Sequence, residues 1–280
     1  MNLKSFLLAS ILALPLAGCG GGGGGGGSPE PLPIVAPLVN GVASMAGSRG
    51  EYTIAKVSGG KYSVTDRTNN SVTNVVDATA IGFSDVTINL GIGDKAVALG
   101  MTNVQSLIEL YIAFLKQVPD ADSLSLWIGR GLTLGDAADQ LAQTGYSASL
   151  TNAEFVTAMY KNVFGRFGTT APTSTELQFW TSRLDKVGLN LGITRGALVL
   201  EMLAAARSGS GDLATQPIVN LLDNKVTVGQ YFAVQQGINF NAESSSRRAA
   251  IAEAVTATDV AAAKGLIGFS DSAFNLALGG

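Results

Sequence analysis

The stretch that decides the fold is Thr151-Asn152-Ala153-Glu154-Phe155-Val156-Thr157-Ala158-Met159-Tyr160-Lys161-Asn162-Val163-Phe164. A threonine followed three residues later by a glutamate is the pattern of a capping box, in which the two side chains satisfy free amides at a helix start. The apolar residues that follow recur at helical spacing and would form one buried face. The stretch therefore predicts an amphipathic helix that begins just after Thr151.

The same pattern occurs earlier in the chain. Thr102-Asn103-Val104-Gln105 also has the form of a capping box, and Thr102 and Tyr111 precede Thr151 and Tyr160 by the same 49 positions. Each predicted helix is followed by a loop and a tryptophan, Trp127 or Trp180. We interpret this as a repeated helix-loop-helix unit over residues 101–210, with further helices over 211–280 packed on it.

These two segments resemble a known family. Phe114-Leu115-Lys116-Gln117-Val118-Pro119-Asp120 up to Trp127, and Asn162-Val163-Phe164-Gly165-Arg166 up to Trp180, resemble the Leu-Gly-Arg-x-Pro-Asp…Gly-Leu-x-Tyr-Trp signature of domain-of-unknown-function family 4214. The residues that carry the resemblance are Tyr111, Pro119, Asp120, Trp127, Tyr160, Gly165, Arg166 and Trp180. The resemblance implies a surface-associated bacterial domain, often found beside calcium-binding repeat proteins, with no catalytic residues to transfer.

The chain departs from this signature in both copies. Lys116-Gln117 replaces Gly-Arg in the first copy, and residues 167–172 replace the Pro-Asp loop in the second.

Residues 35–100 alternate polar and apolar side chains, with turn residues between the runs. Gly59-Gly60 separates two such runs and predicts a hairpin. We expect a small N-terminal antiparallel β-meander of three to five strands. The predicted fold class is therefore α+β and predominantly α-helical.

The first 34 residues predict a membrane anchor and a linker. Leu16-Ala17-Gly18-Cys19 follows an apolar run of signal-peptide length and resembles a bacterial lipobox. The resemblance implies a signal peptide over 1–18, cleavage between Gly18 and Cys19, and acylation of Cys19, whereas an ordinary secreted protein with a chance cysteine is the alternative. Residues 19–34 are glycine- and proline-rich and predict a flexible linker. Gly20 is not the aspartate that favours inner-membrane retention, which favours lipid anchoring in the outer membrane, facing either the periplasm or the surface.

Composition narrows the function. Apolar residues make up 46% of the chain and mean hydropathy is +0.30, enough for a packed core. Charged residues make up only 14%, with a net charge of −3, which argues against nucleic acid as a partner. The chain has no histidine and its one cysteine is Cys19, so histidine- and cysteine-based catalysis is excluded. We expect a non-enzymatic protein without a cofactor.

Some aspartates are weak candidates for a metal site. Asp120 and Asp122 follow Pro119 and could bind calcium, but Asp122 more simply caps the helix that carries Trp127. The aspartates of the N-terminal region are more simply turn residues than calcium ligands; they are Asp66, Asp77 and Asp85.

The aromatic and arginine residues also have two interpretations. A platform for sugar rings could be formed by four aromatic residues, although aromatics at helical spacing are more often core residues. These four are Tyr146, Trp127, Phe179 and Trp180. Arg166 and Arg183 could hold a carboxylate or phosphate ligand, or could bond to a loop carbonyl or a neighbouring acid.

The sequence thus predicts a lipid-anchored envelope protein that binds or scaffolds envelope proteins or polysaccharide. Two alternatives stay open at this point. One is a carboxylate-based glycan-processing enzyme using a pair such as Glu154 and Glu176, and the other is a calcium-dependent adhesion module.

Overall fold

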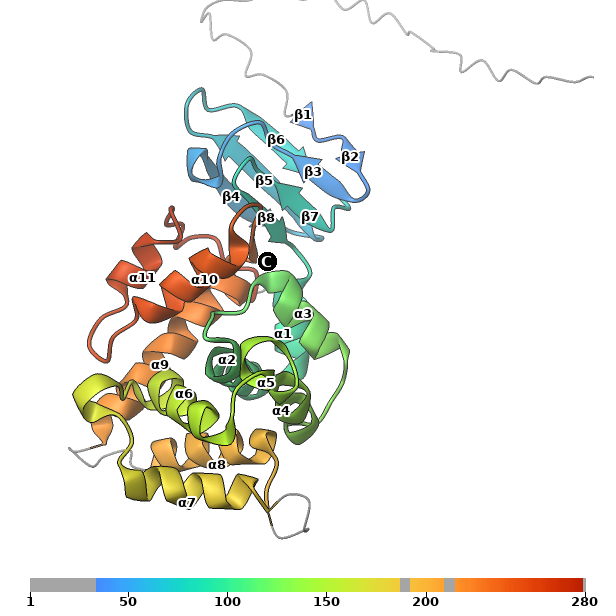
Figure 1. The fold of residues 1–280 in the computed structure, drawn as a ribbon. Helices are drawn as coiled ribbons and strands as arrows, with labels where there is room; N and C mark the ends of the chain where they lie inside the picture. Colours follow the sequence, from blue (N-terminus) through green and yellow to red (C-terminus); the bar gives the residue numbers. More distant parts are fainter. Residues whose placement is uncertain (1–33, 187–191, 209–214, 279–280) are drawn as a thin grey trace, which may run out of the picture. The chain divides into compact units, whose positions relative to one another are not determined.

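The computed structural model describes residues 34–186, 192–208 and 215–278, which belong to one compact unit (Figure 1). The predicted signal peptide and nearly all of the predicted linker, including Gly18 and Cys19, lie outside the described residues. Helix takes up 53% and strand 14% of the described residues, which confirms an α+β fold that is predominantly helical with β-sheet at its N-terminal end.

The strands form two sheets, both of mixed direction. One has the order β1-β6-β5-β4, with β1 parallel to β6 and the other neighbours antiparallel. The other has the order β2-β3-β7-β8-β9, with β3 parallel to β7. The bounds are β1 Ile34–Val35, β2 Leu38–Val39, β3 Val42–Ser44, β4 Tyr52–Val57, β5 Lys61–Asp66, β6 Val72–Val75, β7 Ala80–Gly82, β8 Val86–Asn89 and β9 Ile238–Phe240.

The predicted antiparallel meander was therefore too simple. It describes β4-β5-β6, whose first hairpin turns at Gly59 and Gly60 as expected, both with positive φ. The parallel pairs and β9 join segments that are far apart in the chain. Ile88 of β8, for example, lies opposite Ile238 of β9.

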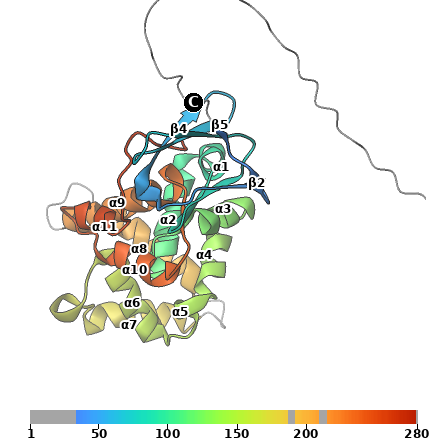
Figure 2. The same ribbon diagram turned by 90° about the horizontal axis from the view of Figure 1, so that it is seen from above.

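Helices make up most of the remaining chain. Their bounds are α1 Ile92–Leu99, α2 Met101–Leu115, α3 Ala121–Gly129, α4 Leu134–Ala142, α5 Gly145–Ala148, α6 Asn152–Phe164, α7 Ser174–Leu184, α8 Arg195–Ser208, α9 Gln216–Gly229, α10 Ser244–Glu253 and α11 Ala261–Gly265. A π-helical turn, Gln230–Gln235, continues directly from α9, and the 3-10 turns are Arg49–Glu51 and Gly168–Thr170. Helix α2 lies among the other helices in both ribbon views and packs against α4, α6 and α9 (Figures 1 and 2).

One of the two predicted capping boxes is present. The Thr151 Oγ1 atom accepts a hydrogen bond from the Glu154 amide, and the Glu154 carboxylate accepts one from the Thr151 amide, so α6 begins as predicted. The box at Thr102 was wrong. Helix α2 starts at Met101, directly after Gly100 (φ 89°), so Thr102 already lies within its first turn. The equivalence of the two helix-loop-helix segments as a repeat stays a prediction.

The buried apolar side chains form two clusters. One joins the sheets to α1, the buried face of α2, the π-helical turn and the C-terminal segment, and includes Ile88, Ile108 and Phe232. The other lies among α2, α4, α6 and α8 and includes Phe114, Phe155 and Met202. Since α2 contributes to both clusters, it connects the sheet region to the helices that follow.

A buried ion pair fastens the C-terminal tail to the sheet region. Arg49 is fully buried, and its Nη2 atom lies 2.7 Å from Oδ2 of Asp271. The guanidinium also faces the rings of Phe83, Phe269 and Phe274 at 4.9 to 5.8 Å. Phe274 and Leu276 of the C-terminal segment are buried in the first apolar cluster.

No single helix among the described residues has the length and apolar character needed to cross a bilayer. Two consecutive helices reach the length and apolar composition of a membrane span only when they are taken together. They are Ile92–Leu99 and Met101–Leu115, which meet at an angle of 108°.

Candidate functional site

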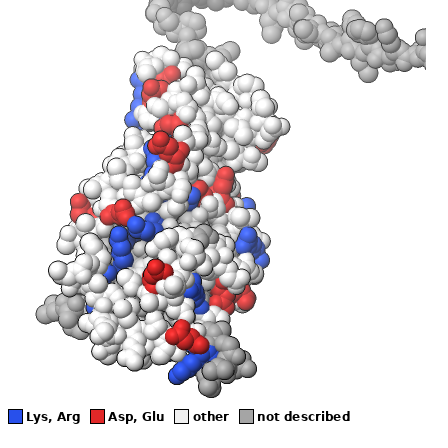
Figure 3. All heavy atoms as spheres, viewed as in Figure 1, with Lys and Arg blue, Asp and Glu red and all other residues white. Residues whose placement is uncertain are grey.

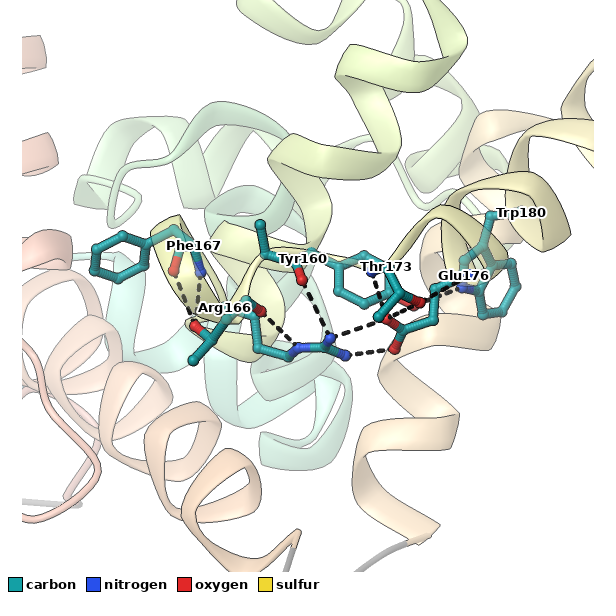
Figure 4. Close-up of polar contacts among 8 residues, drawn as sticks. Tyr160, Arg166, Phe167, Thr173, Glu176 and Trp180 are labelled. Carbon is teal, nitrogen blue, oxygen red and sulfur yellow. Dashed lines mark hydrogen bonds and ion pairs between the residues drawn. The ribbon is translucent and has the colours of Figure 1, made fainter.

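The signature residues of the second predicted copy meet around one ion pair (Figure 4). Nη1 and Nη2 of Arg166 donate to Oε1 and Oε2 of Glu176 at 2.6 and 2.9 Å, a two-pronged geometry. Arg166 follows Gly165, which ends α6 in the left-handed conformation (φ 66°), and Glu176 lies in the first turn of α7. The pair therefore fixes the loop between the two helices.

Four further contacts surround this ion pair, and together with it they form what we call the Arg166 clasp. The Arg166 guanidinium lies 4.8 Å from the ring centre of Tyr160, whose hydroxyl accepts a hydrogen bond of 3.1 Å from Nε1 of Trp180. Arg166 Nε donates to the Thr170 carbonyl at 3.0 Å, and Glu176 accepts from the Thr173 amide at 2.8 Å. The polar side chains of the second predicted copy, Tyr160, Arg166 and Trp180, are thus engaged within the domain.

The electrostatics of the clasp favour a permanently ionised acid. The hydrogen bonds from Arg166, helped by those from Thr173, lower the pKa of Glu176 to about 2. The pKa of Arg166 is raised by the same bond. In α6, hydrogen bonds from the Thr151 amide and hydroxyl lower the pKa of Glu154. Glu154 and Glu176, the two carboxylates considered for a hydrolase, are therefore ionised, and each stabilises the start of its helix.

The candidate metal ligands have structural partners. Asp120, not Asp122, is the cap of α3: its Oδ1 accepts from the Ser123 amide at 2.8 Å, and its Oδ2 lies 3.5 Å from Nη1 of Arg248. The predicted cap at Asp122 was wrong, because the extended backbone that a cap requires falls at Asp120, directly after Pro119.

Asp122 instead accepts a hydrogen bond of 2.6 Å from the Asn89 side chain. Across the described ranges, no group of three or more acidic or cysteine side chains has the arrangement of a metal site.

The aromatic residues do not form one platform. Trp127 and Trp180 are half-buried against the second apolar cluster, whereas Phe179 and Tyr146 are exposed. The Arg130 guanidinium covers Trp127 at 4.3 Å from the ring centre. Of the remaining named residues, Arg183 forms an ion pair with Glu201, and Tyr111 accepts a hydrogen bond from Arg248.

A cluster of charged side chains, which sequence reasoning missed, lines a pocket of about 530 Å³. Its charged residues are Lys116, Lys161, Lys225 and Glu253. They come from the end of α2, the last turn of α6, α9 and the last turn of α10. In the space-filling view, basic side chains gather beside an acidic one on the face where α6 and α10 lie (Figure 3). Four separate segments supply this cluster, so no local motif marks it.

Comparison with known families identifies one domain. The family described as Domain of unknown function (DUF4214) matches residues 137–207, so a domain of this family is present there. The match includes the Arg166 clasp and Lys161, but begins within α4. The first predicted copy, up to Trp127, therefore lies outside it. No curated protein and no solved structure matches this chain.

Proposed function

We propose that this chain is a lipid-anchored protein of the bacterial cell envelope, whose folded part serves as a non-enzymatic binding or scaffold module. The anchor rests on Leu16-Ala17-Gly18-Cys19 and the apolar run before it. A glycine- and proline-rich segment follows, and the described folded part begins at Ile34. This order of segments suits a domain held away from a membrane on a flexible tether.

The proposal that the module is non-enzymatic rests on the bonding of the two candidate catalytic carboxylates, Glu154 and Glu176. A glycosidase needs one carboxylic acid with a raised pKa to protonate the leaving group. Glu176 has a pKa of about 2 and is bonded by Arg166, and the pKa of Glu154 is lowered by its capping box. Both would be ionised throughout the physiological range, which favours a structural role for each.

The anchor is tested by fractionation of cells that express the wild type or Cys19→Ser, with Ser28→Ala as a matched control in the linker. Two acyl signals or more hold a protein on a membrane stably. The wild type and the control should sediment with membranes and incorporate labelled palmitate, whereas Cys19→Ser should do neither. Membrane association of Cys19→Ser equal to that of the wild type would refute lipid anchoring.

The non-enzymatic part is tested by incubating the full chain with envelope polysaccharides and measuring new reducing ends. We expect none above the background of a heat-denatured sample. Reducing ends that appear with the wild type and are lost in Glu176→Gln or Glu154→Gln would establish the hydrolase instead.

A further inference from the structure

The pocket between α2, α6, α9 and α10 has a buried cation at its floor. Lys225 is buried, with only 8% of its surface exposed, and it is one of the residues that line the pocket. Nζ donates to the Asn162 carbonyl at 2.6 Å, near the end of α6, where the free carbonyls of a helix favour positive charge. An ammonium has three donors, and within the described part of the chain no carboxylate lies within 4 Å of this one.

Two further lysines stand at the mouth of the pocket, with one carboxylate between them. Lys116 Nζ lies 2.8 Å from Oε1 of Glu253, and Lys161 Nζ lies 4.0 Å from the same oxygen. Each of these three side chains is about half exposed. With Lys225 protonated, three ammonium groups face one carboxylate, which leaves an excess of two positive charges in one pocket.

The backbone of Lys116 adopts the left-handed conformation, which is unfavourable for residues with a side chain. Lys116 ends α2 with φ 58°, and Gly165 ends α6 in the same conformation (φ 66°). Glycine adopts this conformation at no steric cost, whereas lysine does not. A strained residue whose charged group faces a pocket is a feature that clusters at binding sites.

Most of the remaining pocket wall is apolar, with Asn162 and Thr256 as polar members. Ile112, Leu221 and Val255 line it together with Phe167, whose ring is exposed and lies 5.5 Å from Nζ of Lys161. The volume of about 530 Å³ is in the range of sites that hold small molecules. A charged floor and mouth joined by apolar walls suit a ligand that has an acidic group on an apolar body.

We propose that this pocket binds a small amphiphilic anion, a carboxylate or phosphate carried on an apolar chain or ring, whose acidic group approaches Lys225 and Lys161. In this arrangement Glu253 acts as an internal counter-ion, and the ligand competes with it for Lys116 and Lys161. The inference concerns the folded part alone and does not depend on the lipid anchor.

The protonation of Lys225 adds a pH dependence. Burial, opposed by Glu253 and assisted by Lys161, lowers the pKa of Lys225 to about 8. An anion bound beside it would raise this pKa, so binding is strongest below pH 8 and weakens as the pH rises through this value. Between pH 7 and pH 9 the affinity should fall by roughly tenfold, since about a tenth of Lys225 stays protonated at pH 9.

The test is isothermal titration of the purified full-length chain with four probes: hexanoate, hexyl phosphate, hexyl glucoside and inorganic phosphate. Hexanoate and hexyl phosphate should bind, and the tighter of the two identifies the preferred acidic group. Neutral hexyl glucoside and inorganic phosphate should each bind at least about tenfold more weakly, because one lacks the charge and the other the apolar body.

Some substitutions should weaken the binding of the probe and one should strengthen it, so that an effect on binding can be told from general damage to the fold. Lys225→Met should weaken binding of the tighter probe by about tenfold or more, and Lys161→Ala should weaken it by a few-fold. Glu253→Gln should strengthen binding by a few-fold because it removes the competing carboxylate, a gain that a damaged fold would not produce. Lys61→Ala, an exposed lysine of β5 outside the pocket, is the matched control and should bind as the wild type does.

Three results would overturn the proposal. The first is equal affinity for hexyl glucoside and the anionic probes, and the second is no measurable binding of either anion at millimolar concentration. The third is a Glu253→Gln variant that binds the anion no more tightly than the wild type.

Discussion

The Arg166–Glu176 clasp makes a quantitative prediction about stability. The variant Glu176→Gln removes the negative charge but keeps a side chain that can still complete the capping box with Thr173. It thereby isolates the ion pair from the helix cap. Arg166 would keep its hydrogen bond to the Thr170 carbonyl, so the loop should hold its course.

The size of the effect follows from the pKa. Lowering the pKa of Glu176 from 4.5 to about 2 corresponds to an upper bound of about 3 kcal/mol of folding free energy. The side chains of Glu176 and Arg166 are 33% and 29% exposed, so solvent screening reduces this value to about 1 kcal/mol. In a chain of this size, that is a loss of roughly 2–4 °C in Tm.

The sign of the pH dependence is fixed by the direction of the shift. Because the folded-state pKa lies below the ordinary one, the stabilisation is complete above pH 5 to 6. It decreases as the pH falls below 4.5 and is lost near pH 2.

The assay is urea unfolding of wild type and Glu176→Gln from pH 7 to pH 3, together with Arg166→Met and the double variant. The difference between wild type and Glu176→Gln should be about 1 kcal/mol at pH 7 and about half as large at pH 3. A difference that is absent at pH 7, or that does not change with pH, would refute the assignment of the pair as the stabilising element.

Three other substitutions test the packing around the clasp and the tail. Arg49→Met leaves the Asp271 carboxylate buried without its partner and should lower the free energy of unfolding in urea by about 3–5 kcal/mol. The double variant Arg49→Met/Asp271→Leu should recover much of this loss. A loss below 1 kcal/mol in the single variant would contradict the buried pair. Gly93→Ala would place a methyl group 2.2 Å from the Leu276 carbonyl oxygen, so it should lower Tm by several degrees, and an unchanged Tm would contradict the docking of the tail on α1. Thr151→Ala removes the cap of α6 and should cost about 1 kcal/mol, whereas a neutral result would show that the capping box adds nothing.

Elements that depend on local chemistry were predictable. The start of α6 follows from Thr151 and Glu154, and the β4–β5 hairpin follows from Gly59-Gly60 between two alternating runs. The start of α8 follows in the same way, since the Thr194 hydroxyl accepts a hydrogen bond from the Ala197 amide. In each case the residues that determine the structure lie within a few positions of one another.

Elements that depend on distant partners were not predictable. The three residues of β9 have no strand pattern long enough to recognise, and they become a strand because β8 offers an edge. Helix α1 was missed because it follows β8 after only two residues and was included in the predicted β-region.

The site was predictable only in part, for the same reason. Arg166 and Trp180 were identified through a family resemblance, yet their role as members of a structural clasp required the positions of Glu176 and Tyr160. The lysine pocket was missed entirely. Lys225 and Glu253 lie on different helices and acquire significance only when these helices pack together.

The central claim of a lipid-anchored module is tested most directly by mass spectrometry of the mature N-terminus, purified from the membranes of a bacterial host that processes lipoproteins. The account predicts a chain that begins at Cys19, with a mass increased by a diacylglycerol group and an amide-linked acyl chain. A mature chain that begins elsewhere, or an unmodified Cys19, would contradict it.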